Sequence, residues 1–385
     1  MTETIVDTET LAAFCDRVRT SPYLAVDTEF LRDKTYWPRL CLVQVASPEE
    51  AVAIDPLAPG IDLTPLWDLM HDPKILKVFH AARQDLEIFL HQTGRIPQPL
   101  FDTQVAAMVC GFGESVSFET LATKLAGAQI DKSSRFTDWS QRPLTERQID
   151  YALSDVVYLR PIYEKLRRRL DKADRADWLT EEMAVLTEPA TYRVEAEEAW
   201  RRLKVRSGKP RFLAVLKELA AWREREAQRR DVPRSRIMKD DALLDIAAQA
   251  PASAAEMARS RSLPQGFADG KLGAEVLAAV QRGLALKPDE VPKLEDRPEL
   301  PPGVQPIIEL LRVLLRMKCD ESGVAAKLVA NADDLERIAA DDEADVPAMK
   351  GWRRQLFGED ALALKHGRIA LAVGGRRVRM VRLDA

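Results

Sequence analysis

The sequence predicts a mixed α/β domain followed by two small all-helical domains. Within residues 1–190, strand-like apolar runs come first and then alternate with helical patterns, which is typical of an α/β unit. From about residue 195 onward, β-branched runs become rare and Ala, Leu, Arg and Glu dominate, which indicates helices. At 385 residues the chain is longer than a usual single core, so more than one domain is expected.

The α/β part begins with a helix over 8–20 and a strand from Tyr23 that ends in two acids, Asp27 and Glu29. Two further β-like runs, 40–46 and 51–55, follow after short turns, and the three strands predict an antiparallel meander. The remaining elements alternate: a helix from Pro65 to Met70, a strand over 75–79, and helices over 81–92, 103–110 and 118–126.

Residues 145–171 carry the clearest helix signal of this domain. Thr145 and Gln148 form a capping box, in which each side chain bonds the other residue's backbone N–H. An apolar stripe follows, and Pro161 is expected to kink the helix. Tyr151 and Asp155 are four residues apart and therefore share one helix face.

The helical half divides into two sets with a linker between them. Residues 207–288 predict helices near 210–229, 239–249 and 271–284, and the Pro-rich acidic stretch 289–303 predicts a semi-rigid linker. The second set, 304–385, predicts helices followed by a hairpin at Gly374-Gly375. Its predicted helices are 304–320, 322–330, 332–339 and 350–356.

A formal net charge of −4 conceals a basic segment. Between Arg201 and Lys239 there are 14 Lys and Arg against 4 Asp and Glu. Such an excess favours a phosphate-bearing partner, and the alternative is a solvated helix face laced with i,i+4 pairs. The candidate nucleic-acid contacts are Arg211, Lys217, Arg223, Arg229 and Arg230.

Composition excludes several other kinds of protein. The four cysteines have no CxxC spacing and the four histidines no HExxH spacing, so neither a disulfide framework nor a thiolate or histidine metal site is indicated. The longest apolar runs are far too short to span a bilayer, and the start shows no signal-peptide pattern. We expect a cytoplasmic protein without membrane contact.

Four carboxylates stand in apolar surroundings: Asp27, Glu29, Asp85 and Asp155. Residues two apart on a strand point to one face, so Asp27 and Glu29 project together. An isolated buried charge is costly, and a shared divalent cation would compensate all four. Oxygen ligands suit Mg²⁺, with Mn²⁺ as a substitute.

Three motifs carry a family resemblance: Val26-Asp27-Thr28-Glu29-Phe30, the stretch from His80 to Asp85, and Tyr151-Ala-Leu-Ser-Asp155. Together they resemble the DEDD superfamily of 3′-to-5′ exonucleases, in the variant with a Tyr-x-x-x-Asp third motif. Flanking stretches 36–45, 101–104 and 139–148 are similar to the ribonuclease D family, and residues 211–244 are similar to the HRDC domains that follow the nuclease in that family. A second HRDC-like copy is recognisable mainly by position.

The resemblance implies a ribonuclease-H-like fold and two-metal hydrolysis of RNA 3′ ends, with release of 5′-monophosphate nucleotides. It implies that Asp27 bridges both ions, that Glu29 and Asp155 complete the first, and that Asp85 serves the second. Tyr151 would orient the attacking water, because an ordinary phenol is a poor base at neutral pH. Three further residues are expected near the terminal nucleotide: Thr28, Gln44 and His80.

The resemblance also implies the substrates, tRNA precursors and other stable RNAs, with no organic cofactor and a monomeric protein. One alternative is a DNA exonuclease of the same superfamily, since residue spacing does not distinguish the two polymers. Another is a catalytically inactive adaptor that only binds nucleic acid. The presence of all four acids and Tyr151 favours the enzyme.

Overall fold

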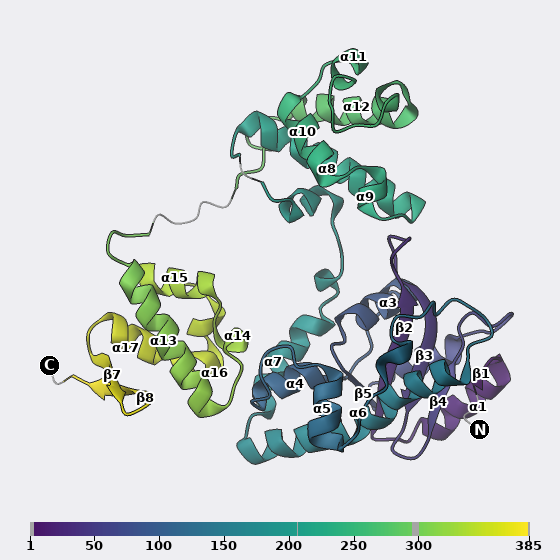
Figure 1. Ribbon diagram of the computed structural model, residues 1–385, viewed down its shortest axis with the longest axis vertical. Coiled ribbons are helices and arrows are strands. Elements are labelled where there is room, and N and C mark those ends of the chain that lie inside the picture. Colours follow the sequence, from purple (N-terminus) through teal and green to yellow (C-terminus); the bar gives the residue numbers. More distant parts are fainter. Residues whose placement is uncertain (1–3, 206, 295–299, 384–385) are drawn as a thin grey trace.

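The computed structural model describes residues 4–205, 207–294 and 300–383. An α/β unit is followed by two helical units, as the sequence predicts (Figure 1). Part of the predicted linker, residues 295–299, lies outside the described residues. Within the described chain, no helix is long and apolar enough to cross a membrane.

The α/β unit is built on a six-stranded sheet in the order β1-β4-β3-β2-β5-β6. β2, β3 and β4 are antiparallel neighbours, which confirms the meander, whereas β5 runs parallel to β2 and β6 parallel to β5. β1 closes the other edge in parallel with β4. The strands are β1 (Thr4–Ile5), β2 (Tyr23–Leu31), β3 (Arg39–Ala46), β4 (Ala51–Ile54), β5 (Leu76–Phe79) and β6 (Leu100–Asp102).

One strand differs from its prediction. β2 does not end at the two acids but continues to Leu31, with an irregularity in its pairing with β3 between Glu29 and Phe30. The apolar run that marks a strand in the sequence stops at Asp27, whereas the backbone pairing with β3 continues through the polar residues. The acids therefore lie within a paired strand rather than at a free strand end.

The helices of this unit flank the sheet. α6 (Glu146–Ala173) packs across β2, β3 and β4, begins with the predicted capping box at Thr145, and contains Pro161. α7 (Ala176–Thr187) was not predicted. The others are α1 (Thr8–Val18), α2 (Thr64–Met70), α3 (Arg83–Thr93), α4 (Thr103–Val109), α5 (Phe118–Leu121), the π-turn η1 (Ala122–Ala126) and the 3₁₀ turns η2 (Lys132–Ser134) and η3 (Pro189–Thr191).

The first helical unit has a buried core of its own. Its long helix α8 (Pro210–Arg230) packs closely on α12 (Lys271–Ala285), where a Cβ on Gly283 would come 2.6 Å from the Cα of Val215. The other elements are η4 (Ala196–Arg202), α9 (Arg234–Ile237), α10 (Asp240–Gln249), α11 (Ala254–Met257) and η5 (Phe267–Asp269).

The second helical unit ends in the predicted hairpin, with β7 (Ile369–Gly374) antiparallel to β8 (Arg377–Arg382). Gly375 in the connecting turn has φ +64°, a left-handed conformation that favours glycine. The helices are α13 (Gln305–Ser322), α14 (Ala326–Val329), α15 (Ala332–Ala340), η6 (Pro347–Met349), α16 (Gly351–Arg353), η7 (Arg354–Gly358) and α17 (Glu359–Lys365), the last of which was not predicted.

The second helical unit packs firmly against the α/β unit. Both contribute to one continuous buried core. Trp178 of α7 stacks on Trp352 of α16 with ring centroids 4.2 Å apart. The buried Arg353 beside it forms ion pairs with Glu181 and Glu182 of α7.

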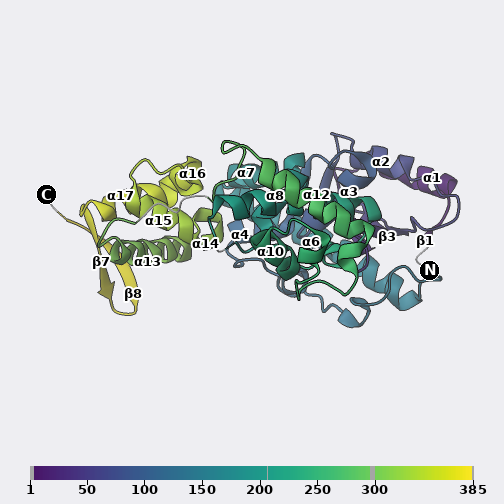
Figure 2. The same cartoon turned by 90° about the horizontal axis from the view of Figure 1, so that it is seen from above.

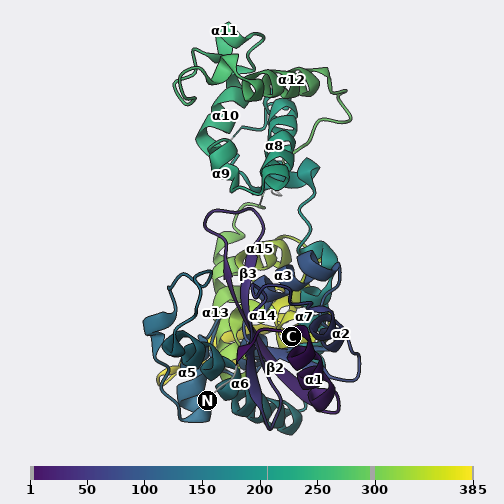
Figure 3. The ribbon, with the colours of Figure 1, turned by 90° about the vertical axis from the view of Figure 1, so that its right-hand side faces the viewer.

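The first helical unit contacts the α/β unit through the loop between β2 and β3, which reaches toward α8 and α9 (Figure 3). The hydroxyl of Tyr36 donates a hydrogen bond to buried Glu224 and accepts one from Arg234 at 3.0 Å. The carboxylate of Asp231 accepts hydrogen bonds from the backbone N–H groups of Tyr36 and Trp37, each at 3.0 Å. The strand that carries two of the predicted acids therefore leads directly into this contact.

Candidate active site

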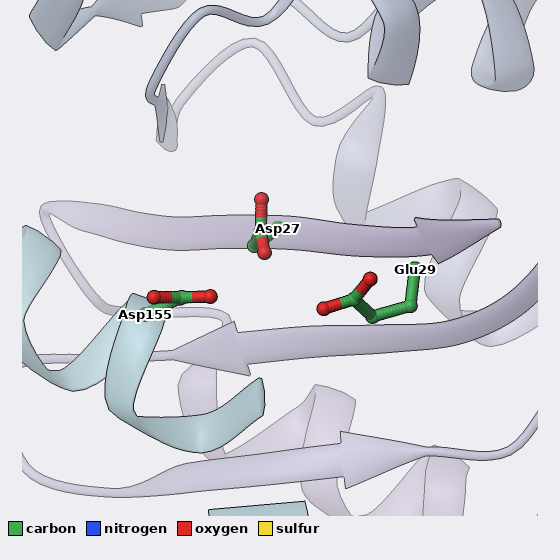
Figure 4. Close-up of side chains that lie close together, drawn as sticks. All are labelled: Asp27, Glu29 and Asp155. Atoms are coloured by element: carbon green, nitrogen blue, oxygen red, sulfur yellow. The ribbon is translucent and has the colours of Figure 1, made fainter. Parts of the chain in front are cut away.

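Three of the four predicted acids form one carboxylate group. Asp27 and Glu29 of β2 and Asp155 of α6 each offer an oxygen within 4.8 Å of the others (Figure 4). Asp27 and Glu29 share a sheet face because they are two residues apart, and α6 crosses that face. A set of three carboxylates with this spacing supplies the hard oxygen ligands that Mg²⁺ and Mn²⁺ prefer.

The electrostatics of the three carboxylates fit a cation. Burial raises the pKa of Asp27 to about 7, and burial together with the charge of Asp27 raises the pKa of Asp155 to about 8. Burial and then the charges of Asp27 and Asp155 raise the pKa of Glu29 to about 10. The three carboxylates repel one another as anions, so a divalent cation between them would offset a real cost.

Asp85 lies beside this group, in the first turn of α3. Burial, and then the charge of Asp27, raises the pKa of Asp85 well above its usual value. The hydroxyl of Thr28 donates a hydrogen bond to Asp85 Oδ1, which favours the charged form. The structure thus brings Asp85 next to Asp27 and outside the three-carboxylate group.

The turn before α3 is held by an acid of the flanking stretch 101–104 that was not among the predicted site residues. Asp102, at the end of β6, accepts hydrogen bonds from the backbone N–H groups of Ala81 at 3.0 Å and Ala82 at 2.8 Å. Ala81 has φ +56°, a conformation that costs energy for a residue other than glycine. Asp102 therefore stabilises a strained turn that positions Asp85.

Tyr151 is one helical turn before Asp155 and faces the same cavity. Burial, and then the charge of Asp155, raises the pKa of the Tyr151 hydroxyl above its ordinary value. The hydroxyl therefore stays protonated at neutral pH. It can donate a hydrogen bond but cannot serve as a general base there.

Asp27, Asp155 and Tyr151 line a cavity of about 350 Å³. His80 lies in its wall, with Nδ1 3.0 Å from the hydroxyl of Thr103. Arg135, which the sequence reasoning missed, is an exposed cation in the same wall, and its charge lowers the pKa of Glu29 and Asp155. It lies in a polar loop before α6 and belongs to no motif, so spacing gave no signal for it.

Two expected substrate contacts are engaged elsewhere or enclosed. The hydroxyl of Thr28 is hydrogen-bonded to Asp85. Gln44 lies opposite Asp27 on β3 and is fully buried, and its amide has no hydrogen-bond partner among the described residues. Thr28 and Gln44 lie beside the acids, and neither of them lines the cavity, whereas His80 does.

The basic segment is partly neutralised by ion pairs. Arg229 and Arg230 both pair with Glu226 of their own helix. Arg223 is buried and bonds Asp240 and the carbonyl of Met238, so its guanidinium is a structural group rather than an RNA contact. The Nζ of Lys217 donates to the carbonyl of Glu290 at 3.3 Å, whereas Arg211 is exposed with no ion pair within the described chain.

Comparison with known proteins agrees with this fold. Residues 2–171 match the family model described as 3'-5' exonuclease, and residues 212–280 match the HRDC domain model. A Ribonuclease D from Nitrobacter hamburgensis is 56% identical over 379 residues, which cover 98% of this chain and 99% of that protein. A Ribonuclease D from Acidiphilium cryptum is 52% identical, with 98% and 97% covered.

A solved structure is similar over nearly the whole chain. The crystal structure of Escherichia coli RNase D, described as an exoribonuclease involved in structured RNA processing, has a TM-score of 0.82 and 32% sequence identity. The similarity covers 95% of this chain and 99% of that one. The predicted fold class, an α/β exonuclease unit followed by a helical HRDC region, is thereby confirmed.

Proposed function

Because the chain belongs to the ribonuclease D family and is a 3′-to-5′ exoribonuclease, we propose that it trims the 3′ ends of tRNA precursors and other stable RNAs. The products are 5′-monophosphate nucleotides. The observation that carries the proposal is the three-carboxylate group, with Tyr151 and Arg135 in the wall of the same cavity. We place the enzyme in the cytoplasm, as a monomer.

The acids divide into two cation sites that share Asp27. Glu29 and Asp155 complete the first site, and Asp85 serves the second. The ions are Mg²⁺ or Mn²⁺, and when bound they activate the attacking water and stabilise the charge that develops on the phosphate. The grouping of Asp27, Glu29 and Asp155, with Asp85 beside Asp27 and outside that group, supports this division.

The remaining groups position the substrate. Tyr151 keeps its proton and donates a hydrogen bond that orients the attacking water. Arg135 contacts the scissile or the terminal phosphate, because a guanidinium can donate two parallel hydrogen bonds to phosphate oxygens. His80 contacts the nucleotide from the cavity wall. Thr28 acts through Asp85, by holding that carboxylate in its charged form.

The test compares three 5′-labelled substrates: a 3′-extended tRNA, a single-stranded RNA and a single-stranded DNA of the same sequence. Each is incubated with Mg²⁺, with Mn²⁺ or with chelator. Stepwise shortening of the RNAs alone, in the presence of metal, supports the proposal. Equal shortening of DNA would favour the DNA exonuclease, and no metal-dependent shortening would leave only the inactive adaptor.

The two helical units are proposed to hold the body of the RNA, with domain boundaries at 1–190, 207–288 and 304–385 and a linker at 289–303. Truncation after the nuclease unit is a poor test of this role. The second helical unit shares its buried core with the α/β unit, so its removal would expose apolar surface as well as remove RNA contacts. Charge substitutions separate the two effects.

A further inference from the structure

The terminal hairpin of β7 and β8 has two different faces. The strand register places Ile369, Leu371 and Met380 on one face, and these side chains pack against the buried core of the second helical unit. The pairs on the opposite face alternate with them. The hairpin is therefore attached to the helices by its apolar side and presents its other side outward.

The outward face combines arginines with very small residues. Arg377 pairs with Gly374, and Arg379 pairs with Ala372 across the two strands. A Cβ on Gly374 would come 3.2 Å from Nε of Arg379, so the glycine leaves room for that side chain to lie along the sheet. Both arginines are exposed.

The charge of the hairpin is uncompensated. Residues 367–383 contain five arginines and no acidic residue. Among the described residues, none of these guanidinium groups has an ion pair or a hydrogen bond to protein, in contrast to Arg229 and Arg230 of the basic helix. The five arginines are Arg368, Arg376, Arg377, Arg379 and Arg382.

A groove adjoins this face. Its volume is about 730 Å³, and Arg316 of α13 lines it together with Arg376 and Arg377. Asp320 and Glu321 lie on the α13 side of the same groove, so the acidic residues limit the basic surface at the helix. The continuous positive surface is thus the hairpin and its turn.

We propose that the outward face of the β7–β8 hairpin binds the phosphate backbone of structured RNA. Arginine forks match phosphate geometry, and a hairpin that carries no acids lets a sugar–phosphate strand approach both guanidinium groups. The inference rests on the proposed function only in that RNA is the substrate. It adds a binding site outside the basic segment that the sequence singled out.

The position of the hairpin determines which RNAs it contacts. Two perpendicular views place β7 and β8 at the opposite end of the molecule from β1 and the outer edge of the sheet (Figures 1 and 2). The hairpin contributes no residue to the cavity that holds the acids. It therefore contacts the body of a long RNA, while the 3′ end lies at the carboxylates, and a short oligonucleotide bound there does not reach it.

The test is the double variant Arg377→Gln/Arg379→Gln in the full-length protein. Binding of a 5′-labelled stem-loop RNA with a 3′ tail is measured in chelator, so that no turnover occurs, at several salt concentrations. Losing two phosphate contacts flattens the slope of log affinity against log salt by about 2. The ratio of the wild-type affinity to the variant affinity for RNA then falls by about tenfold between 50 and 200 mM salt. Metal-dependent turnover of a tetranucleotide is the same in both proteins.

Two further variants make the result decisive. Arg167→Gln/Arg168→Gln removes the same charge from exposed positions of α6 and should leave the slope unchanged. Arg377→Lys/Arg379→Lys keeps the charge and should restore the slope, which excludes a folding defect as the cause. The inference is overturned if the Gln variant binds RNA like the wild type. It is also overturned if the Gln variant loses binding to anionic vesicles while its RNA binding stays intact. Wild-type protein that degrades no RNA would instead overturn the proposed function.

Discussion

Replacing Asp155 by Asn should abolish turnover and yet stabilise the metal-free protein. Asp155 is a half-buried carboxylate whose pKa is raised to about 8 by burial and by Asp27. In the unfolded chain it would titrate near 3.8. The folded state therefore holds the proton more tightly, and the stability present below pH 3.8 is lost progressively as the pH rises toward about 8.

The size of this effect follows from the shift. At pH 7 the pH lies about 3 units above the unfolded-state pKa of Asp155 and still below its folded-state pKa. At about 1.36 kcal/mol per unit, this lowers the free energy of unfolding of the metal-free wild type by about 4 kcal/mol. The Asn variant carries no charge there, so its free energy of unfolding at pH 7 should be higher by up to about that amount. Divalent cation narrows this difference, because a ligand at 100 times its Kd stabilises the native state of the wild type by about 2.7 kcal/mol.

The assay is chemical unfolding at pH 5 and pH 7, with chelator and with Mg²⁺. The variant should be more stable than wild type at pH 7 in chelator, with a smaller difference at pH 5, and Mg²⁺ should stabilise the wild type more strongly. Asp150→Asn, an exposed position of the same helix, is the matched control and should change stability by no more than about 0.5 kcal/mol. A variant that is less stable in chelator, yet gains as much from Mg²⁺, would show that Asp155 is structural. The variant should also keep its affinity for RNA.

Three further substitutions address residues around the acids. Arg135→Gln should lower kcat in single-turnover assays by about 10- to 100-fold, because it removes a cation from the cavity wall, while leaving stability unchanged. Thr28→Val removes the hydrogen bond to Asp85, so the pKa of Asp85 should rise further and the acid limb of the pH–rate profile should move to higher pH. Tyr36→Phe removes the hydroxyl bound to buried Glu224, so it should cost about 1–2 kcal/mol in unfolding experiments and increase amide exchange in the loop between β2 and β3.

Each of these variants has a partner that isolates the lost group. Arg147→Gln is the control for Arg135, because it removes an exposed arginine of α6 that is paired with Asp131. If both variants lose the same amount of kcat, the effect of Arg135 is due only to the net charge of the protein. Thr28→Ser keeps the hydroxyl, and a pH profile shifted like that of the Val variant would contradict the hydrogen-bond argument. Tyr158→Phe is the control for Tyr36→Phe. If both variants lose the same free energy of unfolding, the contact between the units contributes nothing to stability.

The sequence was sufficient for the parts of the site that follow backbone periodicity. Asp27 and Glu29 share a face because strand residues alternate, and Tyr151 precedes Asp155 by one helical turn. The capping box at Thr145 fixed the start of the helix that carries both. These relations are local, so spacing alone specifies them.

Residues placed by tertiary contacts could not be found in this way. Arg135 reaches the cavity because its loop folds over the acids, and Asp102 supports Asp85 across two strand-to-helix turns. The charges of the basic segment are a related case. A count of charges does not show that Arg223 is buried against Asp240 or that the arginines of the hairpin form no ion pair within the described chain.

The strand β2 connects catalysis to the first helical unit. Glu29 and Tyr36 are seven residues apart, and Tyr36 and Trp37 are fixed to Asp231 at the end of α8. Removing that unit would release the loop between β2 and β3 as well as remove RNA contacts, so a truncated enzyme would lose activity for two reasons at once. Tyr36→Phe keeps every arginine and loosens only the loop. If its turnover of a tetranucleotide falls while its RNA affinity holds, the helical unit positions the acids and does not only bind RNA.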